Sequence, residues 1–341
     1  MKSEIALSDT NVSPRIVVML MVKNEQETLA QCISSLLKQS VEIQILVSNN
    51  HSIDNSERIL QAFVEQSPKV LVLKPKAPLE QYENAKFIKD KSLELFPHVQ
   101  FRIILGADDD YTDPRLIEEL LKGYDKCISK GSVNIKSQNL IIVPKIRFQN
   151  VKIPAKSFDL KLDNSLNSES YLVRLLSLVL QPTSKGHFNF VLGLMSKEQM
   201  SEYIDNYFRI AAIENRGNAR PIYSEYFATL KLLENNRIYF DDKVMMTKRI
   251  HNRIGSYVRL QESSKLEQTK LITALKRQFS QSLTFLKATF FLREYLQKRL
   301  FTIYLITGII FFLVNFCNPV LLRIKIRARL LVQAIHRVIL H

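Results

Sequence analysis

Apolar residues in the first 120 positions form short continuous runs, and amphipathic segments lie between these runs. The runs are rich in β-branched residues, as strands buried on both faces are. They are residues 15–22, 42–48, 69–74 and 101–105. The intervening residues 27–39, 56–67 and 83–95 place apolar side chains at helical spacing. This alternation predicts an α/β fold with a mostly parallel central sheet flanked by helices.

Polar clusters follow three of these strands, at the point where each apolar run ends. They are Lys23 to Glu25, Asn49 to Asp54, and Asp108 to Asp110. In an open parallel sheet the carboxyl ends of the strands meet at one edge, where ligands bind. We therefore expect the first 120 residues to form a site at this edge.

The stretch FRIILGADDDYTDP, residues 101–114, sets three adjacent carboxylates at the end of a strand. Such neighbours repel one another unless a cation or solvent compensates them. Asp113 or Thr112 suits the N-cap of the helix that follows, and acids near a helix start are favoured by its dipole. That structural reading leaves Asp108, Asp109 and Asp110 unexplained. Alternate side chains of an extended chain share a face, so Asp108 and Asp110 can hold one divalent cation.

Several nucleotide-binding signatures are absent from the sequence. No G-x-G-x-x-G follows a strand, no G-x-x-x-x-G-K-[ST] occurs, and no glycine-rich loop of the nucleotidyltransferase type follows the first strand. A phosphate ligand would therefore need a metal ion in place of a glycine cradle.

Charge is distributed unevenly along the 341 residues, whose formal net charge is +15. Residues 251–341 hold 15 basic and 3 acidic side chains, against 33 and 30 in the rest of the chain. The three cysteines are sparse and widely spaced, which fits a reducing compartment. The polar N-terminus does not have the pattern of a secretory signal.

Residues 300–322 are the most apolar stretch, and their core at 301–317 is at the lower length limit for a spanning helix. Basic residues flank this stretch, and residues 323–341 interleave basic with aliphatic side chains, as interfacial helices do. We expect a membrane attachment. A buried helical hairpin or a dimerisation element remains open, whereas a nucleic-acid patch is disfavoured because the basic residues alternate with large aliphatic residues and not with polar or base-stacking ones.

The block VVMLMVKNEQETLAQCISSLLKQSVEIQILVSNNHSIDNSERIL resembles the opening of the family 2 glycosyltransferases, and LGADDDYTDP resembles their metal-binding D-x-D. The resemblance is good over residues 16–121 and fainter to about residue 255. It implies the GT-A fold and an inverting transfer of sugar from a nucleotide diphosphate sugar. It also implies Mg²⁺ or Mn²⁺ as a cofactor.

The resemblance also implies roles for individual residues. Donor-binding residues would be Asn24, Glu25, Asn49, Asn50, Asp54, Asn84, Lys86, Asp108 and Asp109. Metal ligands would be Asp108 and Asp110, with His251 as a further candidate. Asn49 departs from the pattern because the family commonly has an acid there, so a carboxylate contact to the base becomes an amide contact. The alternative for Asn49 to Asp54 is an ordinary turn cluster.

Inverting transfer needs a general base for the acceptor hydroxyl. Glu225, near the start of a predicted helix, fits this role best, and Asp241 and Asp242 are its rivals. A surface glutamate in a first helical turn is the structural alternative.

Two further segments contain candidate site residues, the first by its resemblance to the R-x-H of the family and the second by its mixed glycine, basic and aromatic composition. Arg249 and His251, in KRIHNRIGS, would meet the diphosphate or the metal, although a lone histidine is often structural. His187 and Phe188 suit an acceptor-facing loop, with core packing as the alternative for Phe188.

The expected organisation is a tail at 1–14, a GT-A domain at 15–255 and a basic helical membrane-attachment region at 256–341. Residues 15–122 would bind the donor and residues 123–255 the acceptor. We expect an enzyme on the cytoplasmic face of the inner membrane that extends a lipid-linked glycan for surface polysaccharide such as O-antigen or capsule. A homodimer is possible, and no nucleic acid is expected. The alternatives are a non-catalytic sugar-nucleotide-binding or scaffold protein and a metal-dependent phosphotransferase.

Overall fold

The computed structural model describes residues 14–107, 109–110, 113–129, 139–150, 158–159, 167–171, 173–174, 193–215, 224–250, 305–306 and 309. The chain forms two compact units. The first contains Met1–Asn167 and Phe188–His251, and the second contains Ser168–His187 and Asn252–His341. In the second unit the buried Arg174 donates to the carbonyls of Ser168 and Glu169.

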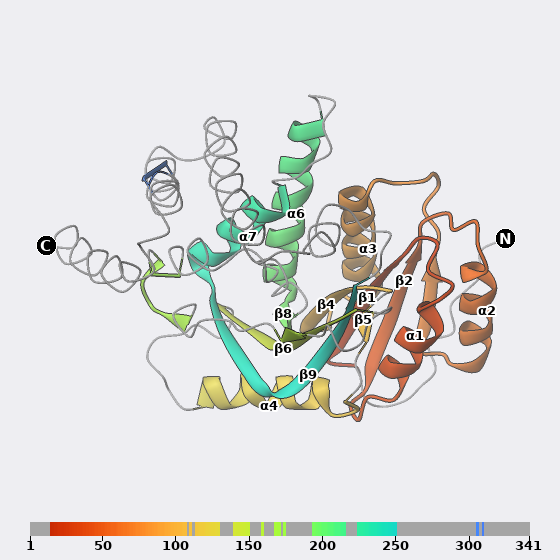
Figure 1. Cartoon of the computed structure of the whole chain (residues 1–341), viewed down its shortest axis with the longest axis horizontal. Helices are drawn as coiled ribbons and strands as arrows, with labels where there is room; N and C mark the ends of the chain where they lie inside the picture. The colour runs from red at the N-terminus through yellow and green to blue at the C-terminus, as the bar shows by residue number, and fades with distance from the viewer. Residues whose placement is uncertain are drawn as a thin grey trace, which may run out of the picture. The chain divides into compact units, whose positions relative to one another are not determined.

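The first unit contains a sheet with the strand order β3-β2-β1-β4-β8 (Figure 1). The strands β1 to β4 are parallel, and the short β8 is antiparallel to β4. Their bounds are β1 (Ile16–Val22), β2 (Ile43–Asn49), β3 (Val70–Leu73), β4 (Phe101–Gly106) and β8 (Met195–Ser196). The four strands predicted from the apolar runs and their parallel arrangement are thus confirmed.

Three helices connect the parallel strands: α1 (Leu29–Leu37), α2 (Ser56–Gln66) and α3 (Gln81–Leu95). The chain moves outward from β1 to β3 and then returns past β1 to reach β4, so its direction reverses there. Right-handed crossovers therefore place α3 on the opposite face from α1 and α2. This reversal makes the carboxyl ends of β1 and β4 the topological switch point of the sheet.

A second sheet of the same unit has the strand order β5-β9-β6-β7. Its strands are β5 (Asp109–Asp110), β6 (Leu140–Asn150), β7 (Phe158–Asp159) and β9 (Arg237–Ile250). The helix α4 (Leu116–Ser129) contacts β6 and β9, while α6 (Lys197–Asn215) and α7 (Ser224–Asn235) pack against each other (Figure 1). The aspartate run thus lies where the chain passes from the first sheet to the second.

The core of the first unit lies around β1 and β4, as the apolar runs predict. The side chains from Ile16 to Leu20 are fully buried. Arg102 of β4 is also fully buried, and it donates to the Ser92 hydroxyl and to the carbonyls of Phe96 and Val99 beyond the end of α3. Burial lowers the pKa of Arg102 to about 10, although the nearby Glu198 acts to raise it. This arginine holds α3 against the sheet because it satisfies carbonyls that a helix end leaves without partners.

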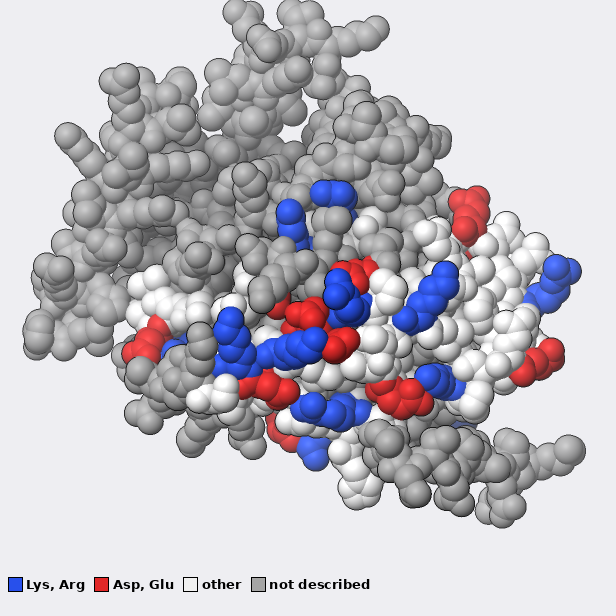
Figure 2. All heavy atoms as spheres, turned by 90° about the horizontal axis from the view of Figure 1, so that it is seen from below, with Lys and Arg blue, Asp and Glu red and all other residues white. Residues whose placement is uncertain are grey.

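Basic and acidic side chains are interspersed on the described part of the face seen from below (Figure 2). Ion pairs of this kind join Lys122 to Glu118 and Glu119 on α4, and Arg15 to Asp125. Exposed pairs such as these contribute little to stability. Their effect is to neutralise charge locally.

Asp54 joins the loop after β1 to the loop after β2. One of its carboxylate oxygens accepts the backbone N–H of Gln26 at 3.0 Å, and the other accepts that of Ser56 at 2.9 Å. Partial burial acts to raise the pKa of Asp54, but the hydrogen bonds from Ser56 and Gln26 bring it below the ordinary value. The Ser56 hydroxyl also accepts the backbone N–H of Glu25 at 2.9 Å. Two loops far apart in sequence are thereby held as one structure.

We expect Asp54→Asn to lower the free energy of unfolding by about 1 kcal/mol at pH 7, because its amide nitrogen would face a backbone N–H. The folded-state pKa of Asp54 lies below its ordinary value of 3.8, so its stabilising effect is present above pH 3.8 and is lost as the pH falls through the folded pKa. Denaturant unfolding of the full chain at pH 7 and at about pH 3 measures both effects. Asp125→Asn, at an exposed position of α4, is the control, and equal losses for the two variants would contradict this role.

Candidate functional site

The loops after β1, β2 and β3 come together at the carboxyl edge of the first sheet. Two residues there have left-handed backbone, Asn24 with φ of 59° and His51 with φ of 52°. Asparagine tolerates this conformation well, whereas histidine adopts it less often. Backbone in this region persists only where neighbouring contacts fix it, and it is common at functional sites.

Asn24 and Asn49 each use the side-chain oxygen to hold backbone of the same loop. Asn24 Oδ1 accepts the N–H of Ile53 at 2.8 Å, and Asn49 Oδ1 accepts the N–H of Ser52 at 3.2 Å. The Ser52 hydroxyl in turn accepts the N–H of Asn24 at 3.1 Å. Asn49 is the last residue of β2 and is only 2% exposed. The two predicted donor-binding asparagines thus lie in one hydrogen-bonded cluster.

Asn50 and His51 fix the loop that follows β3. Asn50 accepts the N–H of Leu79 at 2.9 Å and donates to the Leu79 carbonyl at 2.8 Å, which occupies both ends of its amide. His51 Nε2 lies 2.9 Å from the carbonyl of Pro75, so this nitrogen carries the proton and donates. In this structure the side chain of Asn50 holds a loop, and its predicted contact with nucleotide stays a prediction.

Asn84 and Lys86 both lie on α3, but Asn84 contacts the first sheet whereas Lys86 pairs with aspartates of α3 and α6. Asn84 is buried and lies 2.6 Å from the Ser48 hydroxyl of β2. The Lys86 ammonium pairs with Asp90 at 3.0 Å and with Asp205 of α6 at 3.6 Å, and the hydrogen bond with Asp90 raises the pKa of Lys86. Lys89, whose side chain is 4% exposed, binds both of these aspartates at 2.7 Å. Burial acts to raise the pKa of Asp90, but its bonds with Lys89 and Lys86 hold it below the ordinary value.

The aspartate run begins directly after β4. The structure describes the backbone of Asp109 and Asp110, which pairs with Lys248 and Thr247 of β9, whereas Asp108 lies outside the described residues. Within the part of the chain that is described, no group of three or more His, Cys, Asp or Glu is placed to hold a metal ion. The predicted metal site at Asp108 and Asp110 therefore stays a prediction.

Glu225, the predicted base, lies in the first turn of α7 and is partly buried. On α6, Tyr203 is buried, and its pKa is raised well above the ordinary value, first by burial and then by the charge of Glu225.

The rival Asp241 is buried against α4, where a Cβ added to Gly123 would lie 3.3 Å from its carboxylate. Asp241 therefore faces α4, and the side chain of the other rival, Asp242, lies outside the described residues.

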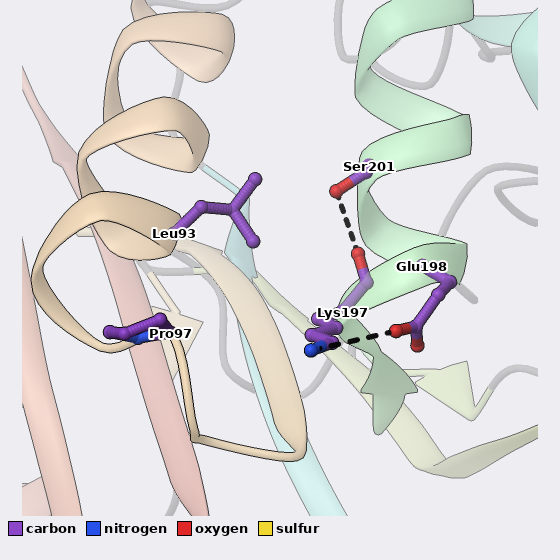
Figure 3. Close-up of a pocket in the computed structure, with 5 residues that line it drawn as sticks. All are labelled: Leu93, Pro97, Lys197, Glu198 and Ser201. Carbon is purple, nitrogen blue, oxygen red and sulfur yellow. Dashed lines mark hydrogen bonds and ion pairs between the residues drawn. The ribbon is translucent and has the colours of Figure 1, made fainter.

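A shallow pocket of about 330 Å³ lies between the end of α3 and the start of α6 (Figure 3). It is lined by Leu93, Pro97, Lys197, Glu198 and Ser201. Lys197 donates its backbone N–H to Gln100, directly before β4, so the pocket is at the amino end of that strand. Leu93 is nine residues along α3 from Asn84, about 14 Å at the helical rise. The pocket is therefore separate from the carboxyl-edge cluster.

Other predicted features lie outside the described residues. They are His187, Phe188, His251, the domain boundary at 255 and most of the region 256–341. Among the helices that are described, none is long and apolar enough to cross a membrane.

Several residues that build the cluster were not singled out from the sequence: Gln26, Ser52, Ser56, Pro75 and Leu79. The first three are polar residues that follow β1 and β2, and the side-chain oxygen of each accepts a hydrogen bond from a backbone N–H. Pro75 and Leu79 contribute only backbone carbonyl and N–H groups, for which a sequence carries no side-chain signal.

Comparisons with solved structures give weak likenesses. S. aureus TarS, matched at 11% identity and a TM-score of 0.49, covers 88% of this chain, which spans 54% of TarS. TarS 1-349 in complex with UDP-GlcNAc matches at 13% identity and a TM-score of 0.43, and the match covers 79% of this chain and 66% of that one. A mannosyltransferase from Pyrobaculum calidifontis in complex with GDP-Man and Mn²⁺ matches at 11% identity and a TM-score of 0.45, and the match covers 95% of this chain and 81% of that one. At these scores the likenesses carry no argument here.

No curated protein matches the chain significantly. Residues 17–85, in contrast, match the family model described as glycosyl transferase family 2. These residues hold β1, β2, β3 and the loops of the carboxyl-edge cluster. The chain is thus similar to the family 2 glycosyltransferases, and residues 17–85 are the part of its sequence that carries the similarity.

Proposed function

We propose that the chain is an inverting, metal-dependent glycosyltransferase, and that it moves a sugar from a nucleotide diphosphate sugar to a lipid-linked glycan of a surface polysaccharide such as O-antigen or capsule. The observation that carries the proposal is the convergence of the loops after β1, β2 and β4 at the switch point of a sheet whose first strands match the family. Ligands of open α/β sheets bind at this place.

The predicted metal ligands, which are carboxylate oxygens, suit a hard divalent cation. Asp108 and Asp110 would hold Mg²⁺ or Mn²⁺ through carboxylate oxygens, with Asp109 and the asparagines of the cluster on the nucleotide. Such an ion, when bound, stabilises the negative charge of the departing diphosphate. A bound cation would also reduce the repulsion between the three adjacent carboxylates at the strand end.

Glu225 would take the proton of the acceptor hydroxyl as the oxygen of that hydroxyl attacks the anomeric carbon of the donor sugar. The bond from the anomeric carbon to the phosphate oxygen breaks, and the nucleoside diphosphate leaves with the electron pair. A single attack from the opposite face inverts the anomeric configuration. The charge of Glu225 acts on the buried Tyr203 of α6, which places this carboxylate at the packing of α6 against α7.

Residues 251–341 would bring the enzyme to an anionic membrane surface on the cytoplasmic side of the inner membrane. The support is their 15 basic residues against 3 acidic ones, interleaved with aliphatic residues near the end. Each basic residue near an anionic surface contributes about 1 kcal/mol to binding. A lipid-linked acceptor would be held at the same surface.

We expect Asp110→Ala to lower metal-dependent turnover of the donor by roughly 10²–10³-fold, because the charge developing on the diphosphate loses its stabilisation. Nucleoside diphosphate release from a panel of sugar nucleotides, with Mn²⁺ or with a chelator, measures this. Asp125→Ala, at an exposed position of α4, serves as the control. Unchanged turnover in Asp110→Ala with an intact fold would remove the assigned site.

Glu225→Gln should lower kcat by roughly 10²–10⁴-fold, because the acceptor hydroxyl loses its general base. The KM for the donor should change little, since the base acts on the acceptor. Glu234→Gln, on the same helix and paired with Lys231 at 2.6 Å, is the control. If both variants keep wild-type kcat in steady-state assays, the base is elsewhere.

Replacing Arg323, Lys325, Arg327 and Arg329 by glutamine should weaken binding of the full chain to anionic vesicles at least tenfold, since each charge contributes about 1 kcal/mol. Co-sedimentation with vesicles of phosphatidylglycerol and phosphatidylcholine measures this, and phosphatidylcholine alone is the reference. Equal sedimentation with both kinds of vesicle would argue against an electrostatic attachment.

A further inference from the structure

Gln39, just beyond the end of α1, binds the start of α4. Its amide nitrogen donates to the carbonyls of Asp113 at 2.9 Å and Ser35 at 3.3 Å, and its side-chain oxygen accepts the backbone N–H of Ile117 at 3.1 Å. A backbone N–H can only donate, so it fixes which end of the Gln39 amide is the oxygen. Gln39 is 8% exposed, so these bonds form where little water can replace them.

Ser40 adds two contacts at the same place. Its backbone N–H donates to the carbonyl of Pro114 at 2.7 Å, and its hydroxyl donates to the Glu118 carboxylate at 2.7 Å. We call the bonds of Gln39 and Ser40 to residues 113–118 the α1–α4 junction. Through it, an N–H group that a helix start leaves without an intrahelical partner is satisfied from outside the helix.

The aspartate run lies between this junction and the first sheet. Gly106, the last residue of β4, pairs with β1, and the backbone of Asp109 and Asp110 pairs with β9. Asp113, which Gln39 holds, is three positions after Asp110, at most about 10 Å along the chain. The α1–α4 junction therefore fixes the chain where it leaves the run.

We propose that Gln39 is a positioning residue for the metal site, and that it acts on Asp108 and Asp110 through the backbone of Asp113. Two carboxylates bind one cation well when their backbone is already held, because ordering a chain upon binding costs conformational entropy. Gln39 does not bind the ion itself. This inference rests on the proposed function, because it takes Asp108 and Asp110 to be the metal ligands.

The test is the binding of Mn²⁺ alone to the full chain, measured from the electron paramagnetic resonance signal of free Mn²⁺. Gln39→Met nearly keeps the length of the side chain but removes its hydrogen bonds. We expect it to raise the Kd for Mn²⁺ about tenfold, the lower end of the effect of residues that orient metal ligands. Gln39→Glu keeps the acceptor for Ile117 but sets an oxygen against the Asp113 carbonyl, so it should raise the Kd as well.

Gln44→Met is the matched control, because the Gln44 amide nitrogen also donates to a backbone carbonyl, that of Lys69, at 2.8 Å. It should lower the free energy of unfolding but leave the Kd for Mn²⁺ as in the wild type. An unchanged Kd in the folded Gln39 variants, or an equal rise in Gln44→Met, overturns the inference while the metal site stands. Absence of Mn²⁺ binding by the wild type, or wild-type affinity in Asp110→Ala, would instead contradict the proposed function.

A second measurement uses the wild type alone, so it does not require any variant to fold. If the α1–α4 junction favours metal binding, bound metal must stabilise the junction by the same factor. Saturating Mn²⁺ should therefore slow hydrogen exchange of the Ile117 amide by up to about tenfold, read by mass spectrometry from peptides that cover residues 113–119. Peptides from α6 are the reference and should not change. Equal exchange at Ile117 with and without Mn²⁺ overturns the inference.

Discussion

The structure of the carboxyl edge depends on one constraint: backbone N–H groups in irregular loops need acceptors when water is partly excluded. In the loops after β1 and β2 these acceptors are side-chain oxygens of the same two loops. Asp54 satisfies Gln26 and Ser56, and Asn24 satisfies Ile53. The backbone is thereby fixed in conformations, including left-handed Asn24, that isolated loops would rarely keep.

This use of oxygens gives the two sides of the edge opposite chemistry. The β4 side is followed by adjacent carboxylates, which only accept when ionised. The β1 and β2 side has its oxygens bound internally and leaves amide nitrogens and the Lys23 ammonium.

The apolar runs were sufficient to predict β1 to β4 and the helices between them, because strands buried on both faces consist mostly of apolar, β-branched residues. The runs did not indicate the split into two sheets or the antiparallel β8, since short edge pairings depend on distant segments. Arg102 was not anticipated inside a buried strand, because its partners are the hydroxyl of Ser92 and backbone carbonyls. The pairing of Lys86 with Asp205 was missed for a similar reason, since more than one hundred positions separate them.

Within the candidate site, residue type predicted the location of each cluster better than it predicted individual roles. Asn49 and Asn50 are adjacent and chemically identical, yet Asn50 uses both ends of its amide on Leu79 while Asn49 uses only its oxygen. Asn49 is the last residue of β2, whereas Asn50 already belongs to the loop after it and meets the loop after β3. A sequence alone cannot show which of the two faces a loop, since that loop's contribution is backbone.

The helix α3 connects the two halves of the expected catalytic site. At its start Asn84 lies against Ser48 of β2, directly before Asn49, and one turn later Lys89 binds Asp205 of α6. Lys89 is almost fully buried, so losing its carboxylates would leave an uncompensated charge, and this makes the join between α3 and α6 costly to break. Since α6 in turn packs on α7 and places Tyr203 near the charge of Glu225, the loops at the carboxyl edge and Glu225 are connected through one continuous set of packed helices.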